Sequence, residues 1–202
     1  MRSSNLIRLA GLAAMVGGVV YAGVAFIVEQ PLAEYLYYMG NIAYGFIAVS
    51  LPLGAMAAIA ALHTLQRQRY GLWGTVVSLT AFVGLALAVG ALTVGVISTS
   101  PDIYSLFNAL VIGLLVASAG ITLLGGLSIS TGMLPRWCGV ALMAGSPVGV
   151  FVTMIPSAAL SLGGTNPIEG VFQALGGVPW VLVGFAIFRA AGRQIERPSR
   201  VR

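Results

Sequence analysis

The side chains best suited to binding a ligand are three carboxamides that lie near acidic or tyrosine side chains. Asn41, Asn108 and Gln173 each occur near the end of a long apolar stretch. A carboxamide both donates and accepts hydrogen bonds, and it is costly where it faces lipid, so we expect these side chains to point into a bundle. The pattern predicts a polar cup for a small ligand, lined by Asn41, Asn108, Gln173, Tyr44, Glu29 and Glu169. The structural alternative is a set of interhelical hydrogen bonds beside an interfacial tyrosine belt.

Groups that carry most membrane chemistry are missing or isolated in this chain. The single histidine, His63, and the single cysteine, Cys138, exclude a pair of haem-ligating histidines, the usual zinc ligand sets and a CxxC redox pair within one chain. No P-loop occurs, and no acidic residue sits in the middle of an apolar span. We therefore predict no catalytic residues, no cofactor and no metal. Glu29 and Glu169 remain as an alternative acid/base pair, if their environments separate their pKa values.

The composition of the chain indicates that membrane-spanning helices must position these groups. Of the 202 residues, 58% are hydrophobic and only 7% are charged, whereas a soluble domain carries about a quarter charged residues. Six spans of about 20 residues would use nearly the whole chain. We therefore predict one transmembrane domain over residues 1–202, with a short N-terminal segment at 1–5 and a basic C-terminal tail at 190–202.

Apolar runs broken by charged or Pro/Gly-rich segments predict six separate transmembrane helices. A cleavable signal is the alternative for the first, but its apolar run is longer than the roughly 7 to 15 residues of a signal core, so we expect an anchor. The predicted helices are Leu6–Val28, Met39–Leu62, Leu72–Ile97, Ser105–Ser128, Trp137–Ile155 and Val171–Phe188.

The charged residues alternate between the predicted loops. All ten basic residues are arginine, and all of them fall on one side of the predicted helices, whereas four of the five acidic residues fall on the other. Because arginine is retained on the cytoplasmic side, we predict a multi-pass protein of the bacterial inner (plasma) membrane with both termini in the cytoplasm and the polar cup facing outward. Charge spread over loops and a tail does not indicate nucleic-acid binding.

Two short matches suggest internal repetition. The stretch Leu6–Gly17 resembles Leu134–Gly145, and Ile103–Leu110 resembles Ile168–Leu175, which aligns Asn108 with Gln173. An all-α fold of three helical hairpins, related as parallel repeats of about 65 residues, would explain both matches. The alternative is that the matches arose by chance, because apolar segments rich in glycine and alanine contain few residue types.

Small residues spaced four apart predict a close helix contact at Ala141, Gly145 and Gly149. The contact is either internal or a surface for a second copy or a membrane-complex partner; the other expected partner is the lipid bilayer. The sequence as a whole predicts a non-enzymatic small-ligand-binding or accessory subunit. A passive channel for a small neutral solute is the alternative, and an enzyme using the outer carboxylates is less favoured.

Overall fold

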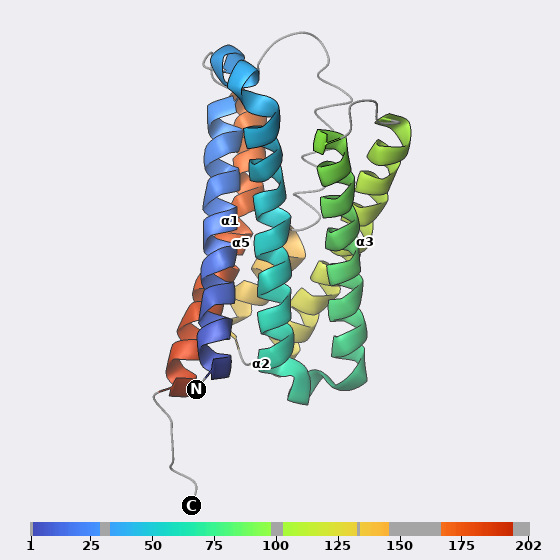
Figure 1. Ribbon diagram of the computed structural model, residues 1–202. Helices are drawn as coiled ribbons and strands as arrows, with labels where there is room; N and C mark the ends of the chain where they lie inside the picture. The colour runs from blue at the N-terminus through green and yellow to red at the C-terminus, as the bar shows by residue number, and fades with distance from the viewer. Residues whose placement is uncertain (1, 29–32, 98–102, 133, 146–166, 196–202) are drawn as a thin grey trace, which may run out of the picture.

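The computed structural model describes residues 2–28, 33–97, 103–132, 134–145 and 167–195; it describes side chains for 4–23, 49–94, 105–132 except 107, 134–145 and 175–192. Four long helices cover most of these residues: α1 (Arg2–Val28), α2 (Ala33–Ile97), α3 (Ile103–Thr131) and α5 (Pro167–Ile195). A fifth helix covers residues 136–145. The described part of the chain is therefore all-helical, as predicted, and its helices form an elongated bundle (Figure 1).

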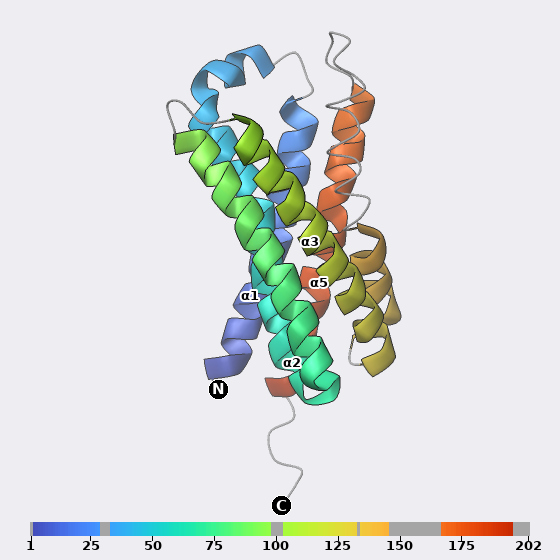
Figure 2. The same cartoon turned by 90° about the vertical axis from the view of Figure 1, so that its right-hand side faces the viewer.

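The continuity of α2 contradicts the prediction of six separate helices in three hairpins. The predicted second and third helices, assigned to different hairpins, form one element that is interrupted only at Gly71, with φ 60° and ψ −149°. Only glycine adopts such a conformation without strain. The first limb of α2 (residues 33–70) and the second limb (72–97) run in opposite directions (Figures 1 and 2). The described residues thus form five helices.

Residues 63–70, which the hydropathy pattern places in a loop between two predicted helices, are helical for a simple reason. Arg67 and Arg69 interrupt the hydrophobic pattern, but arginine and glutamine are good helix formers, so α2 continues through Tyr70. The chain then turns at Gly71 and resumes as a helix at once. Charge ended the apolar run without ending the helix.

Helix packing also differs from the predicted pairing. The most extensive packing joins α1 to α5, the first and last helices, and is followed by that of α2 with α3 and of α1 with α2. At the α1/α5 seam, a Cβ added to Gly11 would lie 2.7 Å from the carbonyl oxygen of Gly184, and one added to Gly18 would lie 2.6 Å from that of Gly177. The two backbones therefore touch directly, as small residues allow in membrane helices.

A comparable seam joins the second limb of α2 to α3. A Cβ added to Gly113 would lie 2.8 Å from the carbonyl oxygen of Gly84, and one added to Gly120 would lie 2.7 Å from the Cα of Ala81. These contacts pack the second limb tightly against α3 over several turns. Both seams leave no room for a side chain between the helices.

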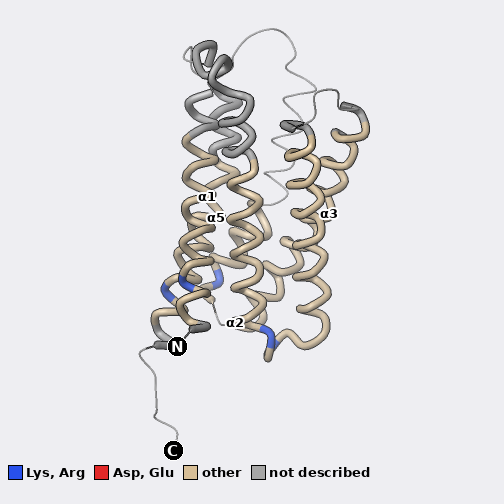
Figure 3. Tube along the Cα trace, in the orientation of Figure 1, with Lys and Arg blue, Asp and Glu red and all other residues tan. Residues whose placement is uncertain are grey.

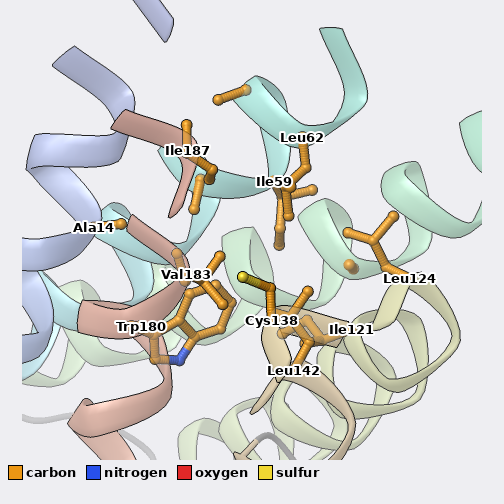
Figure 4. Packing of buried hydrophobic residues seen from close by; sticks show 14 of the residues in the cluster. Ala14, Ile59, Leu62, Ile121, Leu124, Cys138, Leu142, Trp180, Val183 and Ile187 are labelled. Atoms are coloured by element: carbon orange, nitrogen blue, oxygen red, sulfur yellow. The ribbon is translucent and has the colours of Figure 1, made fainter. Parts of the chain in front are cut away.

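Apolar side chains fill the centre of the bundle. The largest fully buried ones include Leu62, Leu124 and Ile187. Cys138 and Leu142, from the helix of residues 136–145, point into the same cluster beside Trp180 and Ile121 (Figure 4). Figure 4 thus shows the short helix joined to α2, α3 and α5 through one apolar core.

The outside of the bundle is equally apolar, as expected of an integral membrane protein. By length and composition, four described helices are able to span a membrane, and the stretch in α2, Val49–Val94, includes the reversal at Gly71. Leu9, Leu79 and Leu123 belong to a large set of exposed apolar side chains on these helices. Lipid is the environment in which such surfaces are stable.

Arginine is confined to one end of the described bundle. Blue segments in Figure 3 lie near the start of α1, the end of α5, the reversal of α2 and the start of the helix of residues 136–145, and no acidic side chain belongs to the described set. We call this the arginine end. Two tryptophans follow arginines closely in the sequence here: Trp73 is 76% exposed and Trp137 44% exposed. Exposed tryptophan beside arginine is typical of a membrane interface.

Candidate functional site

A buried hydrogen-bonded cluster lies at the arginine end, between the first limb of α2 and α3. It consists of Gln66, Tyr70 and Ser128, which we call the polar corner. Gln66 and Tyr70 stand one turn apart on α2, and Ser128 lies in the last turn of α3. The hydroxyl oxygens of Tyr70 and Ser128 are 2.8 Å apart, and Ser128 Oγ donates to Gln66 Oε1 over 3.3 Å. Gln66 is 0% exposed.

The direction of these bonds follows from the number of protons. Ser128 has one hydroxyl proton, which goes to Gln66, so the Tyr70 hydroxyl must donate to Ser128. Gln66 Nε2 is then buried without a hydrogen-bond partner in the described part of the chain. Turning the amide over would pair Nε2 with Ser128 and leave Oε1 unpaired instead. In either placement, one polar atom of this fully buried side chain has no hydrogen-bond partner among the described residues.

His63 extends the polar corner by one turn. It lies three residues before Gln66, hence on a neighbouring part of the same helix face, and its buried Nδ1 also has no hydrogen-bond partner. The histidine as a whole is half-buried. The corner therefore contains uncharged hydrogen-bonding groups, of which Gln66 Nε2 and His63 Nδ1 have no partner among the described residues.

Arg69, which is exposed, stabilises the polar corner through a hydrogen bond to the end of α3. Its Nη1 donates to the backbone carbonyl of Thr131, the last residue of α3, over 2.8 Å. A cation is favourable at a helix C-terminus, because the last carbonyls lack helical partners and carry partial negative charge. Gly74 completes the arrangement: its lack of a side chain makes room for the ring of Tyr70. The end of α3 and the reversal of α2 are thus held together.

The predicted cup residues belong to the opposite end of the bundle. Asn41 and Tyr44 lie on the first limb of α2, and Asn108 lies near the start of α3. Those segments, and the start of α5, lie far from the arginine end (Figure 1). The side chain of Asn108 is exposed.

The other cup side chains cannot be placed. Gln173 and Glu169 lie on the first turns of α5, but their side chains are outside the described set, as are those of Asn41 and Tyr44, and Glu29 lies outside the described residues altogether. The structure therefore brings the helix segments that contain Asn41, Asn108 and Gln173 to the same end of the bundle. The cup remains a prediction.

The predicted small-residue contact has one described internal neighbour. A Cβ added to Gly145 would collide with the ring of Pro179 on α5, so Gly145 allows close packing within the chain. Ala141 is half-buried, and Gly149 lies outside the described residues. A contact of these residues with a second protein remains a prediction.

The spacing of residues along α2 indicates part of the polar corner, although their hydropathy does not. Ile59, Leu62, Gln66 and Tyr70 are spaced three or four residues apart, so the buried face of α2 continues into the arginine-rich segment. Ser128 could not be paired with them from sequence, because nothing there specifies how α3 packs. No protein-family model, no curated protein and no solved structure matches the chain.

Proposed function

We propose that the chain is a multi-pass protein of the bacterial inner membrane that works by binding, as a small-ligand-binding protein or as an accessory subunit, and that neither transports solutes nor catalyses a reaction. The apolar core supports this proposal most directly. Leu62, Leu124 and Leu142 are almost completely buried in the apolar core and come from three different helices. A ligand bound at either end would meet an apolar floor.

The alternative, a channel for a small neutral solute, needs a line of polar groups from one end to the other. Buried polar side chains among the described residues are few and uncharged: Gln66, Ser78, Ser118 and Ser128. Two of these belong to the polar corner at the arginine end. The glycine seams between α1 and α5 and between α2 and α3 further favour a closed bundle, because the backbones there are already in contact.

The proposed orientation places the arginine end in the cytoplasm. Arginine flanking a membrane helix is retained on that side, and the start of α1 and the end of α5 share this end (Figure 1). The outward end would then carry the proposed ligand cup of Asn41, Asn108, Gln173, Tyr44, Glu29 and Glu169.

Reconstituted liposomes provide the test. We expect purified protein to leave the stopped-flow permeability to glycerol and urea at the value of protein-free liposomes, with a known glycerol facilitator as positive control. Permeability above that background would contradict the proposal. The binding claim is tested separately by thermal unfolding against a panel of small polar solutes. A stabilising solute should lose its effect in N41A and Q173A variants and keep it in a Q68A variant, whose exposed side chain lies at the arginine end.

A further inference from the structure

Two arginines at the arginine end of the α1/α5 seam are stacked on phenylalanine rings. The guanidinium carbon of Arg8 on α1 lies 4.9 Å from the centroid of the Phe188 ring on α5. The guanidinium carbon of Arg189 lies 5.0 Å from the centroid of the Phe185 ring on the same helix. Such contacts hold the flat face of a guanidinium against a ring and leave the N–H groups around its edge free to bind oxygen.

Arg8 lacks an anionic partner among the described residues. It lies inside the apolar stretch Ser4–Gly23, it is half-buried, and its buried Nε has no hydrogen-bond partner among the residues that the structure describes. No described side chain is acidic. A charge held partly out of water is costly unless an opposite charge with hydrogen-bonding oxygens accompanies it. An anion with hydrogen-bonding oxygens would satisfy this charge.

The surroundings of the two arginines determine which anion fits. Leu6 and Leu9 on α1 are 65% and 60% exposed, and Leu182 on α5 is also exposed. An anion that brings its own hydrocarbon can cover this apolar surface while its oxygens reach the guanidinium edges. Phospholipid has both parts, and its phosphate lies at the interface depth that tryptophan and arginine mark.

We propose that Arg8 and Arg189 bind the headgroup phosphate of an anionic phospholipid, whose acyl chains lie along the exposed apolar faces of α1 and α5. Arg8 is the anchoring residue, because it is the more buried of the two. Arg189 is exposed and adds a second charge at the edge of the site. The stacked rings of Phe188 and Phe185 orient the guanidinium groups.

The experiment measures how phosphatidylglycerol binds to the full-length protein in detergent, by native mass spectrometry and by the shift in unfolding temperature. We expect phosphatidylglycerol to bind and stabilise more strongly than phosphatidylcholine. In R8Q/R189Q, affinity for phosphatidylglycerol should fall at least about tenfold, because hydrogen bonds to charged groups are strong enough to account for that factor. The matched control is R67Q/R136Q, which removes the same charge from exposed arginines and should keep the wild-type affinity.

A second pair of variants covers the case in which R8Q/R189Q does not fold. R8K/R189K keeps both charges but loses the planar edge of the guanidinium, so it should bind phosphatidylglycerol more weakly than R67K/R136K does. Equal losses in the two pairs would show diffuse surface charge and overturn the proposal. Inorganic phosphate that reproduces the stabilisation at equal concentration would also overturn it, because the site would then bind a free anion.

Glu196 follows the last residue of α5 and lies outside the described residues. We expect E196Q to bind phosphatidylglycerol at least as well as the wild type does. Binding that appears in E196Q but is absent from the wild type would identify Glu196 as the partner of the arginines and would contradict the lipid site.

Discussion

The hydroxyl of Tyr70 lies 2.8 Å from Oγ of Ser128, which joins the reversal of α2 to the last turn of α3 across 58 positions in the chain. Next to it, Arg69 donates to the final carbonyl of α3, and Gly71 supplies the turn. The charge of Arg69, the hydroxyl pair of Tyr70 and Ser128 and the conformation of Gly71 thus stabilise the same corner. Each of the three can be removed by a separate substitution.

Removing the two hydroxyls of the polar corner should have unequal effects. Y70F leaves Ser128 bonded to Gln66 and should cost about 1 kcal/mol. S128A removes the described partner of the Gln66 amide and one of the two partners of Tyr70, and it should cost about 2 to 3 kcal/mol, because the buried amide is then left unpaired. Thermal unfolding in detergent shows which of the two variants is the less stable. A more stable S128A than Y70F would contradict the bond network.

The reversal of α2 should depend on glycine for conformational reasons alone. No atom lies within 4 Å of a Cβ added to Gly71, yet its φ of 60° and ψ of −149° disfavour any side chain. We expect G71A to cost about 1 to 3 kcal/mol. The control is G90A, which is equally open but helical, and which should be neutral or slightly stabilising. Equal unfolding temperatures for the two variants would argue against the reversal.

The α1/α5 seam should not tolerate a methyl group. In G18A the new carbon would lie 2.6 Å from the carbonyl oxygen of Gly177 and 2.9 Å from Val181, so the helices must separate at a cost of about 1 to 3 kcal/mol. G126A on α3 meets no neighbour within 4 Å and is the matched control. The difference in unfolding temperature between these variants measures how much the close packing of α1 on α5 contributes to stability. No difference would mean that α1 and α5 are not in backbone contact.

The proposed orientation predicts the sidedness of introduced cysteines. In intact cells, A33C and S100C should react with a membrane-impermeant maleimide, and S199C should react only after permeabilisation. The wild type is its own negative control, because its single cysteine, Cys138, is fully buried. Labelling of S199C in intact cells would reverse the assignment of the arginine end.

Tryptophan fluorescence tests the depth of the bundle in the bilayer. With the other two tryptophans changed to phenylalanine, Trp73 and Trp137 should be quenched best by a lipid that carries its quencher near the headgroup, since both are exposed at the arginine end. Trp180 is 6% exposed and should respond weakly to every quencher position. Stronger quenching of Trp73 by a deep quencher would place the interface elsewhere.

The sequence predicted the helices well where hydropathy and charge decide the outcome. Residue 28 ends the first predicted helix and also α1, and residue 97 ends the third predicted helix and also α2. Arginine at one end of the bundle was likewise predicted from its alternation with acidic residues in the loops. These features follow from transfer of side chains between water and lipid, which each segment undergoes largely by itself.

Features that depend on backbone torsion or on packing were beyond the sequence. The pattern RQRYG predicts a loop between two helices, but α2 continues through Tyr70 and a single glycine torsion reverses it at Gly71. Burial of Gln66 depends on where α3 packs, which local hydropathy does not encode. The predicted hairpins assumed that neighbours in sequence pack best, whereas the glycines of α1 fit those of α5 most extensively.

The α1/α5 seam also has a consequence for biosynthesis. The ribosome makes α1 well before α5, so the surface around Gly11 and Gly18 lacks its α5 partner until α5 has been made. A chain released before α5 would present that surface to other membrane proteins or to quality-control proteases. Conversely, a separately expressed α5 should be able to dock onto a truncated chain and restore it, because the two helices meet through backbone shape and need no covalent link.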